Sequence, residues 1–373
     1  YGYHVSYVNA VRGQGGQNSI GPERDDNLGA LRTFELLKAM SVLRADIGWL
    51  AENRNSSIVD FGLSKSAEET FEFWDKNHTF QRMVRLVRAY KPDIIIPTFL
   101  DINGQHGHHR AITRATIEAY DNSDNSKIYK DSQFKPWKIS QIFLPAWGGG
   151  GGAYDDEEDP PEATHFIDVG DFNNIFGGTY NQIGEWSRSY HSTQNVSKLA
   201  YEDKLTVPLH LLKGKLVDGD ITGGVIPKNL YELSEFSKDK SGKHLLIEAH
   251  KYSLDAIESF NKTDQLITNL CKLQKLLGDA KKSFSENQVH RIQLKQRQCS
   301  YAMADCIALL PSLCFVSNNH FVGGKIKANL SIHKSDKFNI SNLNKKIITP
   351  FETDLSFQHE INISSNRLNY IFE

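Results

Sequence analysis

Cysteines are few in this sequence, and none are spaced to form a zinc ribbon. Four occur among 373 residues, all in one late stretch: Cys271, Cys299, Cys306 and Cys314. Because no CxxC pair is present, a cysteine-based metal ribbon is not expected. We expect buried free thiols rather than disulfides, since free cysteine is among the most buried residue types. Cysteine use therefore does not indicate the compartment.

Long apolar runs and an excess of one charge are also lacking. No apolar stretch approaches the ~18 residues that a membrane span requires. The chain has 43 basic and 45 acidic residues and a net charge of −2, so we do not expect a nucleic-acid surface, which would show as a basic excess. The composition, 39% hydrophobic and 24% charged, is that of a globular protein. The length predicts two or three domains.

The first residue is Tyr1 rather than Met, and the sequence closes on the apolar run 368–372. We interpret both ends as cuts through a longer protein, so that a secretion signal, if there were one, would lie upstream.

Strands and helices alternate in the first half of the chain. A β-rich stretch at 4–9 is followed by a glycine-rich loop at 13–23 and by an amphipathic helix from about Leu28 to Val42. A second helix spans about 80–90. The apolar run 94–96 then predicts a strand buried on both faces, as in a parallel sheet. This alternation predicts an α/β fold of three layers.

Three histidines lie close together in the stretch DINGQHGHHRAITRA, which begins at Asp101: His106, His108 and His109. They follow the predicted buried strand and precede a helix, at the sheet edge where α/β proteins bind ligands. His106 and His109 are three residues apart, so they share one face of a helical turn. Since neutral imidazole is the commonest metal ligand, these residues and Asp101 suggest part of a zinc or iron site. A solvated histidine-rich loop is the alternative.

Several segments resemble consecutive blocks of the PIG-L/LmbE de-N-acetylase family. The order and spacing of RGQGGQNSIGPE, LGALRTFELLKAM and KPDIIIPTFLDINGQHGHH are those of the family. The later segments 144–170 and 187–194 resemble blocks of its larger bacterial members. The resemblance covers about residues 1–200. It implies a Rossmann-like domain that uses Zn²⁺, or another divalent metal, to hydrolyse the acetamide of an N-acetylglucosamine-type sugar or glycoconjugate.

The resemblance also assigns roles to the histidines. His109 matches a metal ligand, and His106 matches the histidine that stabilises the oxyanion or protonates the leaving amine. His108 stands where the family usually has an aspartate. The family's first motif, His-Pro-Asp-Asp, supplies two ligands and a carboxylate base, and no such string occurs in the 373 residues. We therefore expect that motif upstream of Tyr1 and expect the chain as given to be catalytically incomplete.

Three further residues are candidates for substrate contact. Arg32 matches an arginine near the family's substrate pocket, although an exposed helix arginine is the alternative. Asp101 precedes the histidines, and His191 lies in the block SRSYHSTQ, which we interpret equally as a substrate contact or a capping turn. The glycine run 148–152 predicts either a flap or a surface loop.

The rest of the chain predicts a different architecture. We expect a connecting segment at 201–243, an antiparallel helical pair at 244–312 and the start of a β-sandwich-like module at 313–373, with the deacetylase domain at 1–200. The alternative function is a non-catalytic carbohydrate-binding or scaffold relative of the same fold. The resemblance slightly favours a periplasmic or secreted location, and the oligomeric state is not predicted.

Overall fold

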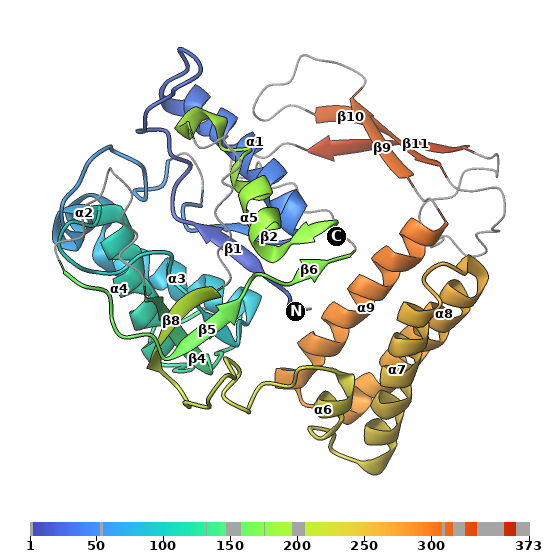
Figure 1. Ribbon diagram of the computed structural model, residues 1–373. Helices are drawn as coiled ribbons and strands as arrows, with labels where there is room; N and C mark the ends of the chain where they lie inside the picture. The colour runs from blue at the N-terminus through green and yellow to red at the C-terminus, as the bar shows by residue number, and fades with distance from the viewer. Residues whose placement is uncertain are drawn as a thin grey trace. The chain divides into compact units, whose positions relative to one another are not determined.

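The computed structural model describes residues 3–52, 55–131, 133–146, 158–174, 176–195 and 206–307, and the backbone of three later strands. The chain divides into two compact units, Tyr1–Ile226 and Pro227–Glu373. Each is considered by itself (Figure 1).

The first unit alternates strands and helices over most of its length. Its first half holds β1 (Ser6–Asn9), α1 (Asp25–Leu43), β2 (Asp46–Trp49), α2 (Ala67–Trp74), α3 (Lys76–Tyr90), β3 (Ile94–Ile95) and α4 (Gly107–Asn122). Its second half holds β4 (Gln141–Pro145), β5 (His165–Asp168), β6 (Phe172–Asn173), β7 (Gly178–Thr179), α5 (Tyr180–Arg188), the 3-10 turn η1 (Ser192–Gln194) and β8 (Thr206–Lys213). The predicted α/β class is confirmed.

The strands of this unit form small sheets. β1 and β2 pair in parallel, with Ser6 opposite Asp46. A second sheet has the order β3-β4-β8-β5, in which β3 and β4 are parallel and β8 is antiparallel to both neighbours. β6 and β7 form a short antiparallel pair. Within the described residues the strands of this unit thus make separate small sheets, of which the four-stranded one is mixed.

The expectation of a strand at 94–96 buried on both faces is wrong. β3 is only two residues long, and Ile96 is 46% exposed. Pro97 follows and has no N–H to donate, which ends the strand. β3 also pairs with β4 alone among the described strands, so one of its edges is not covered by a neighbouring strand.

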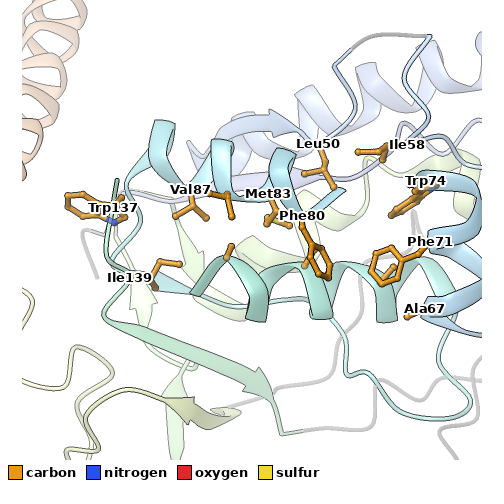
Figure 2. Packing of buried hydrophobic residues seen from close by; sticks show 14 residues of the cluster. Leu50, Ile58, Ala67, Phe71, Trp74, Phe80, Met83, Val87, Trp137 and Ile139 are labelled. Carbon is orange, nitrogen blue, oxygen red and sulfur yellow. The ribbon is translucent and has the colours of Figure 1, made fainter. Parts of the chain in front are cut away.

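Three helices enclose the main core of the first unit, and they fix the position of α4. Figure 2 shows Phe80, Met83 and Val87 of α3 directed toward α4. The α4 face in this core consists of Ala111, Ala115 and Ala119, all fully buried. Small side chains four residues apart let neighbouring helices approach closely, and α2 and α3 use this space for Phe71, Trp74 and Phe80. The packing holds the N-terminus of α4 beside α2.

The second unit is helical and then β-rich. It contains α6 (Leu230–Ser234), α7 (Lys240–Glu258), α8 (Thr263–Ala280), the 3-10 turn η2 (Lys281–Ser283) and α9 (Glu286–Cys306). The sequence predicted a pair of helices in this region. The structure instead has three long helices, because α7 and α8 are separate. The amide of Lys262 donates to the carbonyl of Ser259 at 2.8 Å, which closes a turn around Asn261.

The described strands of this unit form one antiparallel sheet of order β11-β10-β9, made of β9 (Leu310–Phe315), β10 (Lys325–His333) and β11 (Asp354–Asn362). The alternating pattern predicted strands in this region, and β10 and β11 confirm them. A second, facing sheet would lie outside the described residues.

Cys271, Cys299 and Cys306 are free thiols. Only Cys299 is fully buried, and Cys271 is exposed, so the expected burial is wrong for Cys271. Among the helices that the structure describes, none has the length and apolar character of a membrane span.

Candidate functional site

The three predicted histidines lie together at the start of α4. His106 is the N-cap residue, with extended backbone, and its carbonyl accepts from the amides of His109 and Arg110 at 3.0 and 3.1 Å. Gly107 opens the helix at a point where a side chain would not fit. A Cβ there would lie 2.5 Å from Ser64 Oγ and 2.8 Å from Thr70 Oγ1, and would also clash with the carbonyl of Ser66.

Ring contacts fix the orientations of the histidines. The rings of His106 and His109 are 5.6 Å apart between centroids, so the structure brings the two predicted residues together. His109 stacks on Phe99 at 3.9 Å with an angle of 5° between the planes. His108 is buried between Phe61 and Trp74, at 4.5 and 4.9 Å.

Burial keeps these imidazoles neutral. It lowers the pKa of His109 to about 4, helped by the neighbouring His106 and His108. Burial likewise lowers the pKa of His108 to about 4. The pKa of His106 is also lowered by burial, while Asp60 and Glu69 act in the opposite direction. A neutral imidazole has a lone pair on one ring nitrogen, which is the form that binds metals.

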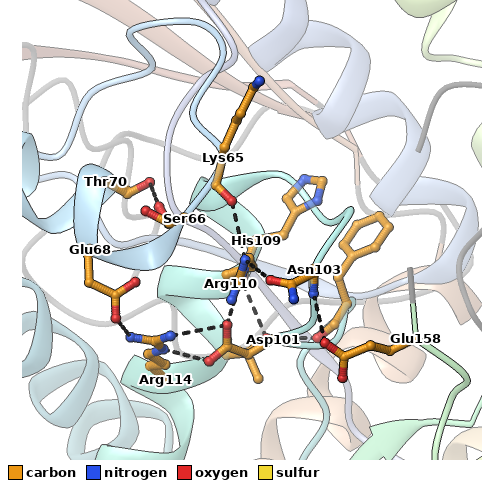
Figure 3. Close-up of polar contacts among 12 residues, drawn as sticks. Lys65, Ser66, Glu68, Thr70, Asp101, Asn103, His109, Arg110, Arg114 and Glu158 are labelled. Atoms are coloured by element: carbon orange, nitrogen blue, oxygen red, sulfur yellow. Dashed lines mark hydrogen bonds and ion pairs between the residues drawn. The ribbon is translucent and has the colours of Figure 1, made fainter. Parts of the chain in front are cut away.

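Asp101 is held by two arginines of α4 (Figure 3). Arg110 Nε donates to Oδ1 at 2.7 Å and Arg114 Nε donates to Oδ2 at 2.5 Å. Arg110 also donates to Asn103 Oδ1 and to the carbonyl of Lys65, both at 3.3 Å. Both carboxylate oxygens of Asp101 thus connect the loop before α4 to the helix. A substrate that contacts Asp101 would therefore bind to oxygens that already accept hydrogen bonds from Arg110 and Arg114.

Arg32 holds the glycine-rich loop. Its guanidinium donates to the carbonyls of Gly13 at 2.8 Å and Gln17 at 2.6 Å. Burial lowers the pKa of Arg32, and the carboxylates of Asp60 and Glu35 oppose this effect. Asp60 also acts electrostatically on His106, whose pKa it raises.

Glu35 is a functional candidate that the sequence reasoning missed. Its buried carboxylate accepts from the backbone amide of Thr193 at 2.8 Å and from the Thr193 hydroxyl at 2.6 Å. These bonds attach the turn η1 to α1. The sequence did contain a sign of this role, because Glu35 is an acidic residue at a buried position of the helix α1, one turn after Arg32.

His191 precedes this turn and lies near the same charges. Its pKa is lowered by burial, with Glu35 raising it and Arg32 lowering it further. The structure thus places Arg32, Glu35 and His191 near one another. Within the Tyr190–Gln194 segment, Ser192–Gln194 forms the 3-10 turn η1, which is hydrogen-bonded to α1 through Thr193. The glycine run 148–152 lies outside the described residues.

The residues that the structure describes do not by themselves form a complete metal site. The neutral, stacked imidazole of His109 suits a divalent metal in its chemistry, and His106 lies beside it. In the described ranges, no group of three or more His, Cys, Asp or Glu side chains is placed to hold an ion. Among the described residues, His109 and His106 are the ones that could contribute to such a site.

Comparison with known proteins finds matches in the part of the chain that contains these residues. The family model described as GlcNAc-PI de-N-acetylase (PIG-L) matches residues 1–120, which contain Arg32 and all three histidines. The 1D-myo-inositol 2-acetamido-2-deoxy-alpha-D-glucopyranoside deacetylase of Streptomyces scabiei (strain 87.22) is 27% identical over 160 residues. The match covers 38% of this chain and 46% of the relative, less than half its length. Residues 1–120 of this chain therefore form a domain of the PIG-L family.

Proposed function

We propose that this chain is part of a metal-dependent hydrolase that removes the acetyl group from an N-acetylglucosamine-type sugar or glycoconjugate. The observation that carries the proposal is the pair His106 and His109 at the start of α4, inside the segment that matches the family. The printed name of the relative from Streptomyces describes deacetylation of an acetamido sugar, which supports the substrate class.

His109 would be a ligand of zinc or of another divalent metal. Its neutral state and its stacking on Phe99 present a ring of fixed orientation. When bound, such a metal polarises the acetamide carbonyl and makes water a stronger nucleophile at neutral pH. We propose that the remaining ligands and the carboxylate base come from a His-Pro-Asp-Asp motif outside these 373 residues.

His106 would act on the substrate directly. An amide hydrolysis develops negative charge on the carbonyl oxygen and needs a proton for the leaving amine, and an N–H of His106 can serve either need. One such donor is worth about 3 kcal/mol of barrier in other amide hydrolases. Arg32 and His191 would contact the sugar from the side of α1, and Asp101 would act mainly by holding the loop before α4.

The same proposal accounts for the separate sheets. β1 with β2 and β3 with β4 are both parallel pairs inside one compact unit. In each pair a helix connects the strands in sequence, as in a Rossmann-like fold. We propose that a further parallel strand, carrying the missing motif, joins the two pairs into one sheet.

The test uses the parent protein extended upstream by one βαβ unit of roughly 30 residues. Its metal content is measured by mass spectrometry, and acetate release is measured with N-acetylglucosamine-type substrates. We expect about one metal ion per chain, the number of a mononuclear catalytic site, and its loss in His109→Ala. The matched control is His244→Ala, because His244 is an exposed histidine of the second unit.

The proposed hydrolase activity would be refuted if the extended protein folds but neither binds metal nor releases acetate. That result would leave the carbohydrate-binding or scaffold relative as the function.

A further inference from the structure

A buried carboxylate connects three segments of the first unit that lie far apart in the sequence. Glu35 on α1 is 8% exposed, and its two oxygens accept from the amide and the hydroxyl of Thr193. Thr193 lies in the turn η1 and is fully buried, and its own carbonyl accepts from the amide of Ser19 at 3.0 Å. These two residues, which we call the Glu35–Thr193 clamp, thus connect α1, η1 and the glycine-rich loop.

The glycine-rich loop is held at a second place by Arg32, which lies one turn before Glu35 on α1. The guanidinium of Arg32 donates to the carbonyls of Gly13 and Gln17. The loop fits closely here, because a Cβ at Gly13 or Gly16 would clash with this guanidinium. The loop is thus bound to α1 twice, directly through Arg32 and indirectly through η1 and Glu35, so its position depends on both side chains.

The carboxylate of Glu35 is an unfavourable group to bury, so packing alone does not explain it. A carboxylate removed from water needs hydrogen bonds or opposite charges in place of its hydration. The two donors of Thr193 and the nearby charge of Arg32 supply them. Glu35 also acts electrostatically on His191, two residues before Thr193. Since an apolar side chain would fill the same position of α1 without these requirements, we attribute the carboxylate to the orientation of its neighbours.

We propose that Glu35 is a positioning residue that holds Arg32 and His191 in place to bind one sugar ring. Arg32 belongs to the same helix, and His191 directly precedes the turn that the clamp attaches to this helix. Polar groups that are fixed before a ligand arrives lose less conformational entropy when it binds. The sugar contacts of Arg32 and His191 rest on the proposed function, whereas the Glu35–Thr193 clamp does not.

The clamp is tested first, by hydrogen exchange of single amides, measured by NMR on the full 373-residue chain. Glu35→Met keeps the length of the side chain and a good helix former, but it cannot accept from Thr193. We expect the amides of Thr193 and Ser19 to exchange at least about tenfold faster in this variant. The amides of α3, which is not part of the clamp, should keep their rates. Unchanged exchange at Thr193 and Ser19 would overturn the proposal.

Glu35→Gln is the conservative variant, because it keeps the hydrogen bonds and removes the charge. Its amide oxygen can accept from the Thr193 amide, and its amide nitrogen can donate to the Thr193 hydroxyl. Exchange at Thr193 and Ser19 should therefore stay close to that of the unchanged chain. Glu185→Met is the matched control, since it removes a carboxylate of α5 that forms an ion pair with Arg188 and should leave both amides unaffected.

The positioning role is tested by sugar binding to the parent protein extended upstream. The methyl glycoside of N-acetylglucosamine is titrated and its Kd is measured by NMR. Glu35→Met should weaken binding by about tenfold, and Glu35→Gln by less than about threefold. Because Glu35 acts through Arg32 and His191, the variant that combines Glu35→Met with Arg32→Ala should bind more tightly than the product of the two single effects predicts. A residue that only stabilised the fold would leave the Kd of the folded protein unchanged.

The outcomes separate this inference from the proposed function. Faster exchange in Glu35→Met with an unchanged Kd would make the clamp purely structural and would overturn the positioning role. An extended protein that binds the sugar with the expected changes in Kd but releases no acetate would defeat the hydrolase and support the positioning role. An extended protein that binds no sugar, or whose Kd is unchanged by Arg32→Ala, would overturn the positioning role.

Discussion

Arg88 is a buried cation whose hydrogen-bond partners are backbone carbonyls. Its side chain is 1% exposed. Nε donates to Ser123, Nη2 donates to Asn125 and Ile128 at 2.8 and 3.1 Å, and Nη1 donates to Tyr129. The planar guanidinium thus binds the loop after α4 at four carbonyls, and their dipoles solvate its charge in place of water.

Arg88→Lys should lower the free energy of unfolding of the first unit by roughly 2–4 kcal/mol, because an ammonium group cannot reach four carbonyls in one plane and leaves several unpaired. Urea unfolding followed by circular dichroism measures the loss. The control is Arg188→Lys, whose exposed ion pair with Glu185 is worth less than about 1 kcal/mol. Equal stability of the two variants would contradict the role of Arg88.

Two histidines at the start of α4 whose pKa is lowered should make stability depend on pH. The pKa of His108 and that of His109 are about 4 in the folded chain, below the usual 6.5. The unfolded chain therefore binds more protons between these values, so the free energy of unfolding falls as the pH drops from 6.5 toward 4. The contribution is complete above 6.5. Urea unfolding across this range should show a shallower slope for His109→Gln than for the unchanged chain, and an identical slope would refute the assignment.

At the scale of single elements, local sequence patterns predicted individual helices better than they predicted contacts between distant segments. The apolar period of α1, α3 and α4 and the histidines at the start of α4 could be read from neighbouring residues. The bond between Glu35 and Thr193 joins residues 158 apart, and β8 inserts between β4 and β5 from beyond residue 200. No local pattern encodes such contacts. The sequence also could not show that Asp101 would be held by Arg110 and Arg114, because acidic and basic neighbours in a helical segment have many alternative pairings.

The start of α4 offers a test of how tightly the site is built. Gly107→Ala should destabilise the first unit by about 1–3 kcal/mol, because its Cβ would clash with the oxygens of Ser64, Ser66 and Thr70. This would outweigh the better helix propensity of alanine, which is worth about 1 kcal/mol.

Gly184→Ala is the matched control. Gly184 lies inside α5 with no atom within 4 Å of an added Cβ, so only the gain in propensity remains. Thermal unfolding of the two variants should move in opposite directions. A stabilised Gly107→Ala chain would show that the packing at the start of α4 is looser than described.

At the scale of the whole molecule, the two compact units predict separate responses to ligands. If the proposed metal site is correct, zinc at 100 times its Kd should stabilise the first unit of the extended protein by about 2.7 kcal/mol. The helices of the second unit hold none of the proposed site residues, so hydrogen exchange should slow only in the first unit. If hydrogen exchange slowed equally in both units, the expectation of separate responses would be wrong. If it slowed in neither unit, the proposed metal binding would be contradicted.

The alanine face of α4 has a consequence for how the site can evolve. One end of the helix carries the histidines, and Ala111, Ala115 and Ala119 continue along its length against α2 and α3. We expect a larger side chain at Ala119 to push α4 away from α3, and the imidazoles at the start of the same helix to move with it. The orientation of the proposed catalytic groups can thus change through substitutions several turns away that contact neither the proposed substrate nor the proposed metal.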